Sequence, residues 1–269
     1  MLTVSAFVAL SWLCLRFIHE CSIITVKSEV KELTVACGWL PCGMRIVHFS
    51  DWHWEFSKLP EADLYVCSGD MYPDCPSIDK FGQRQKRIER IKQFSHANKL
   101  AANGGFKQYL GSPDAPVICV RGNHDYADLA PLFEGCNLVH EFIVNEVVEV
   151  AGLRVTGHRG IPHIYGGFAD EMGRAELLDL ARSMDDSCDL YLTHYPPAGV
   201  LDNEYGLGGI LSWMEYKTKK SNVLHCMGHI HEEGGQTLQH GHVLFSNAAT
   251  TYNLLEGSPE EGWKNVSPL

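Results

Sequence analysis

The chain has 269 residues, of which 45% are hydrophobic and 20% charged, and its formal net charge at pH 7 is −11. The length suits one large domain better than two small ones, and the composition is that of a globular protein. The negative charge argues against a broad basic surface for nucleic acid. A chain of this size does not need disulfides, and several of its ten cysteines lie in apolar runs, so we expect free thiols and a cytoplasmic location.

Residues 1–43 differ from the rest of the chain. The apolar run Leu2 to Leu15 is shorter than the roughly 20 residues of a membrane-spanning helix, and no basic residue or clear cleavage site marks it as a signal peptide. Loose alternation over residues 24–39 predicts a marginal hairpin. We therefore expect a working domain over residues 44–269 and no stable membrane insertion, with weak association of the N-terminal segment with a membrane as the alternative.

From Met44 onward, short apolar runs alternate with segments of helical periodicity. The runs predict strands over residues 45–49, 63–67, 116–120, 142–150, 152–157, 189–193, 223–227 and 242–246. Apolar residues recur at helical spacing over residues 78–94, 172–181 and 207–214. This alternation predicts an α/β domain in which helices cover sheets, and the absence of a linker or repeat favours one domain.

Polar side chains follow five of the predicted strands, at the point where each strand ends. They are Asp51 and His53, Asp70, the run Asn123-His124-Asp125, His194, and the pair His229 and His231. In layered α/β proteins, ligands bind at the carboxyl ends of strands. Each pair spaced two residues apart points to one side of an extended chain. The glycines that precede these residues, Gly69, Gly122 and Gly228, suit tight turns and close backbone approach.

The chemistry of these side chains indicates a metal centre. Mixed oxygen and nitrogen ligands suit manganese, iron or zinc better than calcium or magnesium alone. Seven candidate ligands are too many for one open catalytic ion: Asp51, His53, Asp70, Asn123, His194, His229 and His231. They fit two ions about 3.5–4 Å apart that share a carboxylate, as in two-metal hydrolases. The competing interpretation is a set of polar turns after strands.

Taken in order, these motifs resemble those of the calcineurin-like metallophosphoesterase superfamily, over residues 44–250. Two stretches are closer still to its small phosphodiesterase branch, the metallophosphoesterase-domain (brain protein 239) type. They run from Thr193 to Asp202 and from Gly228 to Ala248. The chain departs from the protein serine/threonine phosphatases, which carry Arg-Gly after the second motif where this chain has residues 71–74.

The resemblance implies a four-layer α-β-β-α sandwich of two mixed sheets flanked by helices, with a dinuclear metal site at the carboxyl ends of the strands. It implies that one ion is held by Asp51, His53, Asp70 and His231. It implies that the other is held by Asp70, Asn123, His194 and His229, with Asp70 bridging. His124 would then lie over the substrate phosphate, beside Asn123, and stabilise or protonate the leaving alkoxide, and Asp125 would orient the His124 imidazole.

The function implied is that of a metal-dependent phosphoesterase, and more narrowly of a phosphodiesterase acting on a small phosphate ester such as a cyclic nucleotide. Two divalent cations, manganese by preference and iron, zinc or magnesium otherwise, would lower the pKa of a shared water so that hydroxide attacks phosphorus. The alternatives are a DNA nuclease, a phosphomonoesterase and a non-catalytic scaffold. The acidic charge weighs against a nucleic-acid partner, and the sequence leaves the oligomeric state open.

Several residues outside the motifs carry secondary expectations. Arg159 and His163 lie in a Gly/Pro-rich loop and are candidates for substrate contact. His48 alternates with strand core positions and is expected to be an interior histidine. Trp52 either packs the strand end or stacks on a nucleobase. The basic run over residues 84–92 is expected to be the solvated face of its helix.

Overall fold

The computed structural model describes residues 25–28, 31–34, 43–74, 83–164, 166–203 and 220–268. The chain divides into two compact units, Met1–Leu40 and Pro41–Leu269. In the first unit, β1 (Thr25–Ser28) and β2 (Lys31–Thr34) pair as an antiparallel hairpin, which confirms the hairpin predicted there. Within the described ranges, no helix combines the length and the apolar character that crossing a bilayer demands.

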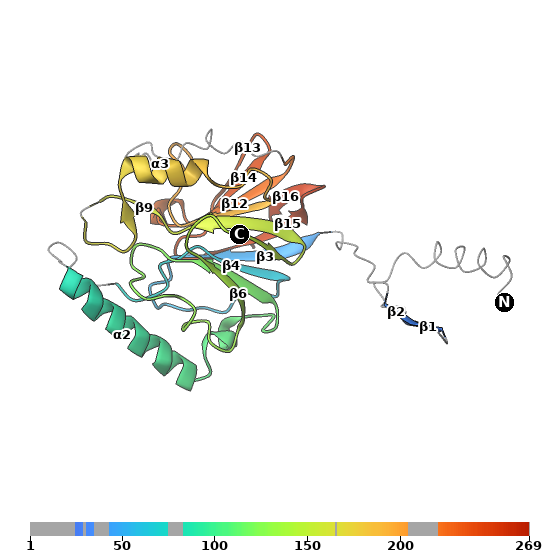
Figure 1. Cartoon of the computed structure of the whole chain (residues 1–269), viewed down its shortest axis with the longest axis horizontal. Helices are drawn as coiled ribbons and strands as arrows, with labels where there is room; N and C mark the ends of the chain where they lie inside the picture. The colour runs from blue at the N-terminus through green and yellow to red at the C-terminus, as the bar shows by residue number, and fades with distance from the viewer. Residues whose placement is uncertain are drawn as a thin grey trace. The chain divides into compact units, whose positions relative to one another are not determined.

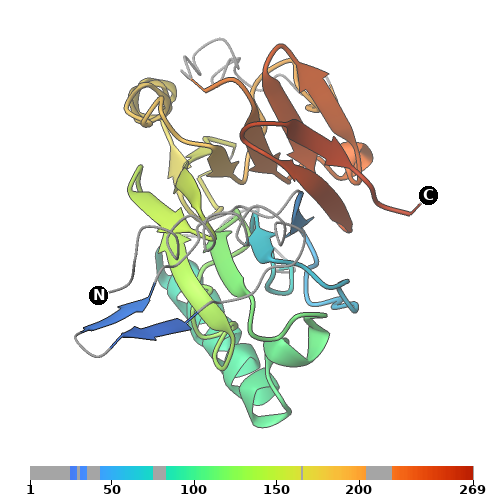
Figure 2. The ribbon, with the colours of Figure 1, turned by 90° about the vertical axis from the view of Figure 1, so that its right-hand side faces the viewer.

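The second unit is built on two six-stranded sheets (Figures 1 and 2). The first has the order β16-β15-β3-β4-β5-β6, with bounds Gly262–Asn265, Tyr252–Ser258, Met44–Phe49, Leu64–Cys67, Pro116–Val120 and Asn137–Phe142. The second has the order β13-β14-β12-β11-β8-β7, with bounds Thr237–His240, Val243–Asn247, Val223–Met227, Leu190–Thr193, Leu153–His158 and Val147–Val150. Both sheets are mixed, because parallel strands at their centres are bordered by antiparallel ones.

The central strands are mostly apolar and buried because each sheet is covered on both faces there. In β4, all four residues of Leu64–Cys67 are buried. Leu64 and Val66 enter the core between the two sheets, whereas Tyr65 and Cys67 enter the core on the outer face of the first sheet. Continuous apolar runs are typical of parallel strands that are buried on both faces. The four-layer sandwich of two mixed sheets is therefore confirmed.

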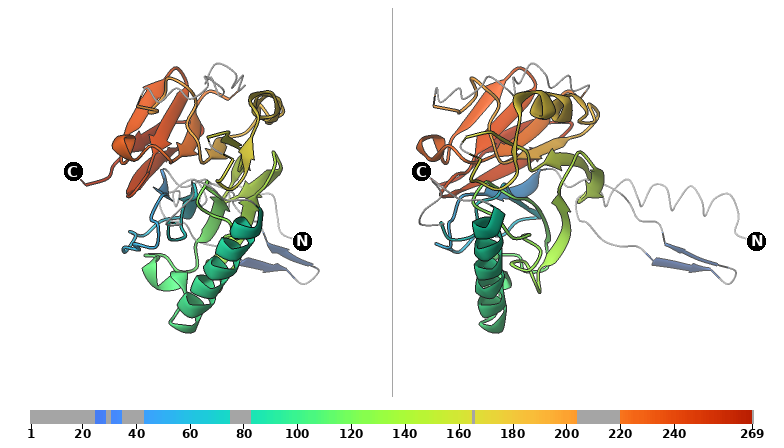
Figure 3. Two further views of the ribbon diagram at one scale, coloured as in Figure 1. Left: turned by 90° about the vertical axis from the view of Figure 1, so that its left-hand side faces the viewer. Right: turned by 60° about the vertical axis from the view of Figure 1, so that its left-hand side comes forward.

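Helix α2 (Gln83–Ala102) packs along the outside of the first sheet, and α3 (Arg174–Arg182) lies beside the second (Figures 1 and 3). The basic residues Arg87, Arg90 and Lys92 are exposed, as expected for the solvated face of α2. The apolar periodicity, however, does not mark the buried side. Ile88 and Ile91 are 37% and 62% exposed, and the helix buries Glu89, Gln93 and Ala97 instead. Polar contacts of the buried side chains, described below, fix this orientation. The predicted helix over residues 207–214 lies outside the described residues.

Short elements complete the described part of the unit. A two-stranded parallel ribbon joins β9 (Ile161–Pro162) to β10 (Glu171–Met172), and single 3₁₀ turns span Phe106–Tyr109 and His231–Glu233. The strand predicted over residues 142–150 is wrong: β6 ends at Phe142 and β7 begins at Val147, and the two belong to different sheets. The predicted strands do not include β13, β15 and β16, the short β9 and β10, or β6 before Phe142.

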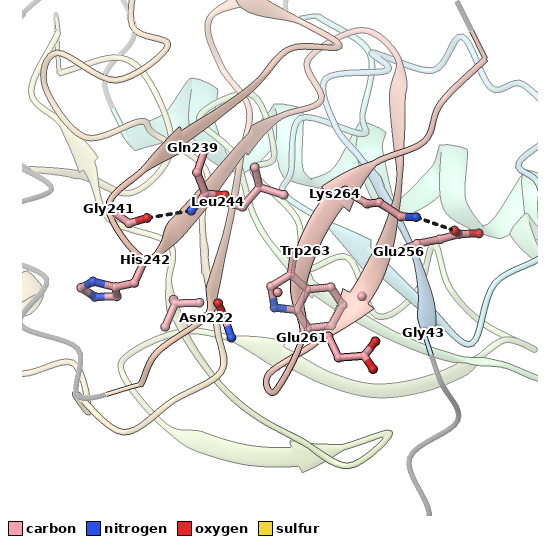
Figure 4. Close-up of a pocket in the computed structure, with 13 residues that line it drawn as sticks. Gly43, Asn222, Gln239, Gly241, His242, Leu244, Glu256, Glu261, Trp263 and Lys264 are labelled. Carbon is pink, nitrogen blue, oxygen red and sulfur yellow. Dashed lines mark hydrogen bonds and ion pairs between the residues drawn. The ribbon is translucent and has the colours of Figure 1, made fainter.

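A pocket of about 670 Å³ opens where β3 and β12 begin, between the ends of the two sheets (Figure 4). Its lining includes Asn222, Gln239, Glu256 and Trp263. Because β3 and β12 run away from this pocket, it lies at the opposite end of the sandwich from the polar residues that follow these strands. The pocket is therefore separate from the site that the motifs predict.

Candidate metal centre

Backbone hydrogen bonds join the loops that follow neighbouring strands. Beyond β3 and β4, the Asp51 N–H donates to the Gly69 carbonyl at 2.8 Å, and the His53 N–H donates to the Asp70 carbonyl at 3.0 Å. In the second sheet, the Gly228 N–H donates to the His194 carbonyl at 2.9 Å. Because β3, β4 and β5 are parallel, and β11 and β12 are parallel, each sheet delivers its polar residues to one end. The two ends meet at one rim, where His194 Nδ1 donates to the Ser68 carbonyl and the His229 N–H donates to Asp51 Oδ2.

Four of the predicted ligands have left-handed backbone conformations. The φ angles are 55° at Asp51, 43° at His53, 52° at Asp70 and 70° at His229. Such conformations cost an L-residue on the order of 1–2 kcal/mol and concentrate at functional sites. They turn the chain sharply at the end of each strand, so that the side chains of separate loops face one another.

The first cluster comprises Asp51, His53 and His231, each offering one ligand atom within 4.8 Å of the others. The His231 Nε2 atom lies 3.3 Å from Asp51 Oδ1. This buried Oδ1 atom makes no hydrogen bond of good geometry within the described residues. An unsatisfied buried carboxylate oxygen beside two imidazoles is the donor set that a divalent cation requires.

The second cluster comprises Asp70, His194 and His229, with ligand atoms again within 4.8 Å of one another. His194 donates from Nδ1 to the Ser68 carbonyl at 2.7 Å, which leaves Nε2 facing Asp70 Oδ2 at 3.2 Å and Asn123 Oδ1 at 3.0 Å. His229 Nδ1 lies 2.8 Å from the same Asn123 oxygen. A carbonyl that fixes one ring nitrogen so that the other faces the site is typical of metal-binding histidines.

Two glycines leave no room for a side chain beside the carboxylates. A Cβ atom on Gly122 would collide with Asp70 Oδ1, and one on Gly228 would collide with Asp51 Oδ2 and Ser50 Oγ. The close backbone approach predicted from the glycines is therefore confirmed at both positions. At these turns, the backbone itself forms the wall against which the carboxylates are held.

The electrostatics of the centre favour a bound cation. Burial alone would raise the pKa of Asp70, but His194 and His124 lower it below its usual value. Burial lowers the pKa of His194, but the carboxylates of Asp70 and Asp51 outweigh burial and raise it to about 10. Burial lowers the pKa of His229 to about 4. Two buried carboxylates thus hold positive charge in the centre, and the residues fit divalent metal ions.

Asp125 does not lie where the resemblance implies. Its buried carboxylate accepts four backbone hydrogen bonds, from Asp70 at 2.7 Å, Met71 at 3.0 Å, Tyr72 at 3.1 Å and Gly122 at 2.9 Å. In the described part of the chain it makes no contact with the His124 ring. The oxygen that does is Asp74 Oδ1, which lies 3.0 Å from His124 Nδ1 and 2.7 Å from His53 Nδ1. Asp74 is thus the carboxylate that faces His124 Nδ1, although this nitrogen makes no hydrogen bond of good geometry to the described residues, whereas Asp125 is occupied by amides.

Sequence reasoning missed three further side chains around His124 and the second cluster. Gln93 on α2 donates from Nε2 to the His124 carbonyl at 2.6 Å and accepts the Ala127 N–H at 2.8 Å. The Phe168 ring lies 5.2 Å from the His124 ring, and the Tyr195 ring lies 4.7 Å from the His229 ring. Tyr195 directly follows His194 and could have been found from that motif, whereas Gln93 and Phe168 carry no local signal.

The two loop residues expected to contact substrate are paired with acidic neighbours. Arg159 Nε lies 3.3 Å from Asp170 Oδ1, and His163 Nδ1 lies 3.6 Å from Glu171 Oε2. Their loop reaches the centre through Phe168 and through the Ala169 N–H, which donates to the Asn123 carbonyl at 2.9 Å. Substrate contact by Arg159 or His163 stays a prediction.

Trp52 is 4% exposed, packs against Phe49 and Phe106, and donates from Nε1 to the Thr251 carbonyl at 3.0 Å. Its ring is therefore part of the core beneath the strand end. Of the two interpretations of this residue, the structure favours packing.

A two-sheet sandwich with paired carboxylate–histidine clusters at one rim defines a metallophosphoesterase. The family model for calcineurin-like phosphoesterases matches residues 44–233. Because this match covers more than half of the chain, the protein belongs to the calcineurin-like phosphoesterase family. It is accordingly a hydrolase that acts on phosphoric ester bonds, in a family that depends on a dinuclear metal centre.

Curated relatives agree with this assignment. The chain is 25% identical over 219 residues to the UPF0046 protein K07C11.7 of Caenorhabditis elegans, an alignment that covers 77% of this chain and 69% of the worm protein. It is 28% identical over 144 residues to the human and mouse proteins named metallophosphoesterase domain-containing protein 1. That alignment covers 51% of this chain and 40% of each mammalian protein, so it spans less than half of their length.

Proposed function

We propose that the protein is a metal-dependent phosphodiesterase that hydrolyses a small phosphate ester such as a cyclic nucleotide. The observation that carries the proposal is the side-by-side arrangement of the clusters Asp51/His53/His231 and Asp70/His194/His229. In this arrangement, Asp70 would bridge two divalent ions, and Asn123 would complete the second ligand set. We propose manganese as the preferred ion, with iron, zinc or magnesium as alternatives. When bound, such ions lower the pKa of water and neutralise charge on phosphate oxygens.

His124 is the residue that we place against the substrate. Its ring lies outside both proposed ligand sets and belongs to a third group of possible ligands, with His53 and Asp74, in which its Nδ1 atom faces Asp74. With Nδ1 on the side of Asp74, Nε2 is left to hydrogen-bond a phosphate oxygen and to give a proton to the leaving alkoxide. Phe168 packs against the ring and limits its rotation. The chain thus supplies an oriented proton donor beside the ion-binding residues.

The charge around the site favours a diester over a monoester. A phosphomonoester carries up to two negative charges and a diester carries one, so a monoesterase benefits more from free cationic side chains. Both arginines of this region are already paired. Arg121 lies 3.0 Å from Asp128 and 3.0 Å from Asp170, and Arg159 also contacts Asp170. A monoanionic substrate needs no further cation beyond the two ions.

A hydrolysis panel tests the proposal. The purified full-length chain is stripped of metal, refilled separately with manganese, iron, zinc or magnesium, and assayed on a bis-ester, a cyclic nucleotide, a monoester and single-stranded DNA. We expect the bis-ester and the cyclic nucleotide to be cleaved fastest. His124→Ala should retain metal and lose about 10²–10⁴-fold in turnover, the usual contribution of a positioned proton donor.

Each other outcome of the panel identifies a competing function. Faster cleavage of the monoester would indicate a phosphomonoesterase, and faster cleavage of DNA would indicate a nuclease. Cleavage of none of the four with metal bound would indicate a scaffold. Loss of metal in His124→Ala, in proportion to the loss of turnover, would contradict the role proposed for this residue.

A further inference from the structure

Helix α2 concentrates positive charge in an acidic protein. Six of the 22 Lys and Arg residues of the chain lie in its 20 residues, with only one of the 33 Asp and Glu residues. That single carboxylate, Glu89, is 6% exposed and faces the protein, where it accepts hydrogen bonds from Gln85 and Lys92. The outward side of the helix therefore carries no acidic side chain, although the whole chain has a net charge of −11.

The same outward side exposes two isoleucines, three residues apart and so on one face of the helix. Ile91 is 62% exposed and Ile88 is 37% exposed. The helix is not free to rotate and bury them, because its opposite side is fixed by hydrogen bonds. Gln93 joins the His124–Ala127 loop, and Lys86 donates to the Phe168 carbonyl at 2.7 Å. The exposure of the isoleucines is thus imposed by the contacts that hold the candidate site.

We define the α2 outer face by Arg87, Ile88, Ile91, Lys92 and Lys99, all of which are exposed. Lys92 is paired with Glu89 at 2.7 Å. Arg87 and Lys99 make no ion pair with any residue that the structure describes. The exposed isoleucines are therefore flanked by two cations without an ion pair, Arg87 and Lys99, and by Lys92, which is paired with a buried carboxylate.

We propose that the α2 outer face docks on the surface of an anionic phospholipid membrane. Lipid headgroups supply the negative charge that the face attracts, and the boundary between headgroups and acyl chains accepts the isoleucines. Nucleic acid would match the charge but offers no apolar phase for Ile88 and Ile91. The helix is about 30 Å long and runs along the outside of the first sheet (Figure 3), so its length can lie along a flat surface.

The size of the face sets the strength of this interaction. Two isoleucines and a few cations support weak, reversible attachment and not insertion across the bilayer. Because attraction between exposed charges is screened by salt, attachment should fall as ionic strength rises. An acidic protein could match the charge too, and the experiment below distinguishes it from lipid.

Sedimentation with lipid vesicles tests the proposal on the full-length chain. Vesicles of phosphatidylcholine alone are compared with vesicles in which about one third of the lipid is phosphatidylserine. We expect binding only to the anionic vesicles. The double variant Arg87→Glu/Lys99→Glu should weaken binding by about tenfold or more, because each basic residue near a membrane contributes about fivefold. The double variant Ile88→Asn/Ile91→Asn should weaken binding by about tenfold or more as well, because it removes the apolar side chains that enter the boundary between headgroups and acyl chains. All variants keep residues 1–43, so any contribution of that segment cancels.

Matched controls place the same changes elsewhere on the surface. Val139 and Val144 are 41% and 49% exposed, and the side chains of Arg182 and Lys264 are 58% and 70% exposed. The variants Val139→Asn/Val144→Asn and Arg182→Glu/Lys264→Glu should bind anionic vesicles as the unmodified chain does. Melting temperatures and turnover of a soluble diester verify that every variant is folded.

Three results would overturn the proposal. One is equal binding to neutral and anionic vesicles. A second is unchanged binding by both α2 variants, or an equal loss in the control variants. The third is failure to bind any vesicle, and binding to polyglutamate that the α2 variants lose would then assign the face to an acidic protein. None of these results depends on which phosphate ester the enzyme hydrolyses.

Discussion

Replacing Asp125 distinguishes its observed role from the one that the resemblance implies. The side chain is fully buried and accepts four backbone N–H groups. Three of these donors, on Asp70, Met71 and Tyr72, belong to the loop after β4, and the fourth, on Gly122, belongs to the loop after β5. One carboxylate therefore links the two loops that carry Asp70 and Asn123. Its loss should loosen the ligand set and not merely the His124 ring.

The structure sets the magnitude of the effect. Asp125→Ala leaves four buried donors without an acceptor, and each unsatisfied donor costs about 1–3 kcal/mol. Water that enters the vacated space recovers part of this cost, so we expect a loss of about 4 kcal/mol in the free energy of unfolding. Asp125→Asn should lose about half as much or more, because its amide nitrogen faces N–H donors. Against a typical total of about 5–15 kcal/mol, either loss is large.

Urea unfolding of the metal-free protein measures this loss, and elemental analysis of the refilled protein measures metal content. Asp74→Asn is the matched control, because the side chain of Asp74 is 65% exposed. It should change the free energy of unfolding by less than about 1 kcal/mol and lower turnover by about tenfold or more. If Asp125→Ala retained its stability and metal but lost turnover, Asp125 would orient His124 after all, and the reasoning would be wrong.

Three further predictions follow from the contacts around the centre. Gln93→Leu removes both hydrogen bonds to the His124–Ala127 loop, so turnover should fall about ten- to a hundredfold; a matching loss of metal would contradict a positioning role. His48 is buried between Ser68 and Ser246, and burial lowers its pKa to about 3. Below pH 6.5 only the unfolded chain binds a proton at this histidine, so the free energy of unfolding falls as pH drops toward 3, by about 2 kcal/mol at pH 5. In urea unfolding at pH 7 and pH 5, the variant His48→Gln should lack this part of the pH-dependent loss. If both proteins lost the same free energy of unfolding between the two pH values, His48 would not be its source. Removing metal with a chelator should lower the melting temperature, and refilling with manganese should restore it; an unchanged melting temperature would mean that folding and metal binding are uncoupled.

Most of the central strands could be predicted because their burial is complete. In Leu64–Cys67 and Val223–Met227 every residue is buried and all but His225 are apolar, so a predominantly apolar run followed by a polar residue marks both the strand and its end. Once the strands are parallel, their ends share a rim, and the polar residues there must meet. Topology within each sheet therefore explains why the motifs gather at one end, and packing between the sheets brings the two ends together as the two clusters.

The face of α2 could not be predicted from periodicity. Ile88 and Ile91 follow helical spacing, but Glu89 and Gln93 are the residues that the protein buries. The Gln93 amide gains its partners only when the helix lies against the His124 loop, which is remote in sequence. Glu89 is hydrogen-bonded within the helix, by Gln85 and Lys92. Hydrogen-bonding contacts thus decided the orientation against the apolar pattern.

The strand predicted over residues 142–150 failed for a related reason. Ile143, Val144 and Val147 continue the apolar pattern of β6, yet the chain passes there from one sheet to the other. All three are at least 38% exposed. A pattern of β-branched residues indicates extended structure but not the sheet to which each part belongs, because that depends on packing between the sheets.

The left-handed residues of the centre connect the ligands to one another. Each costs on the order of 1–2 kcal/mol, and each is held by a hydrogen bond from the next loop. Asp51 donates to Gly69 and His53 to Asp70, while the His229 N–H donates to Asp51 Oδ2 at 2.9 Å. The backbone conformation of each ligand therefore depends on the loop that carries the neighbouring ligand. Substitutions within this set should therefore have non-additive effects on metal affinity. The double variant Asp51→Asn/His229→Ala should lose less metal affinity than the sum of the losses in the two single variants. Strict additivity in metal titrations would show that the loops act independently.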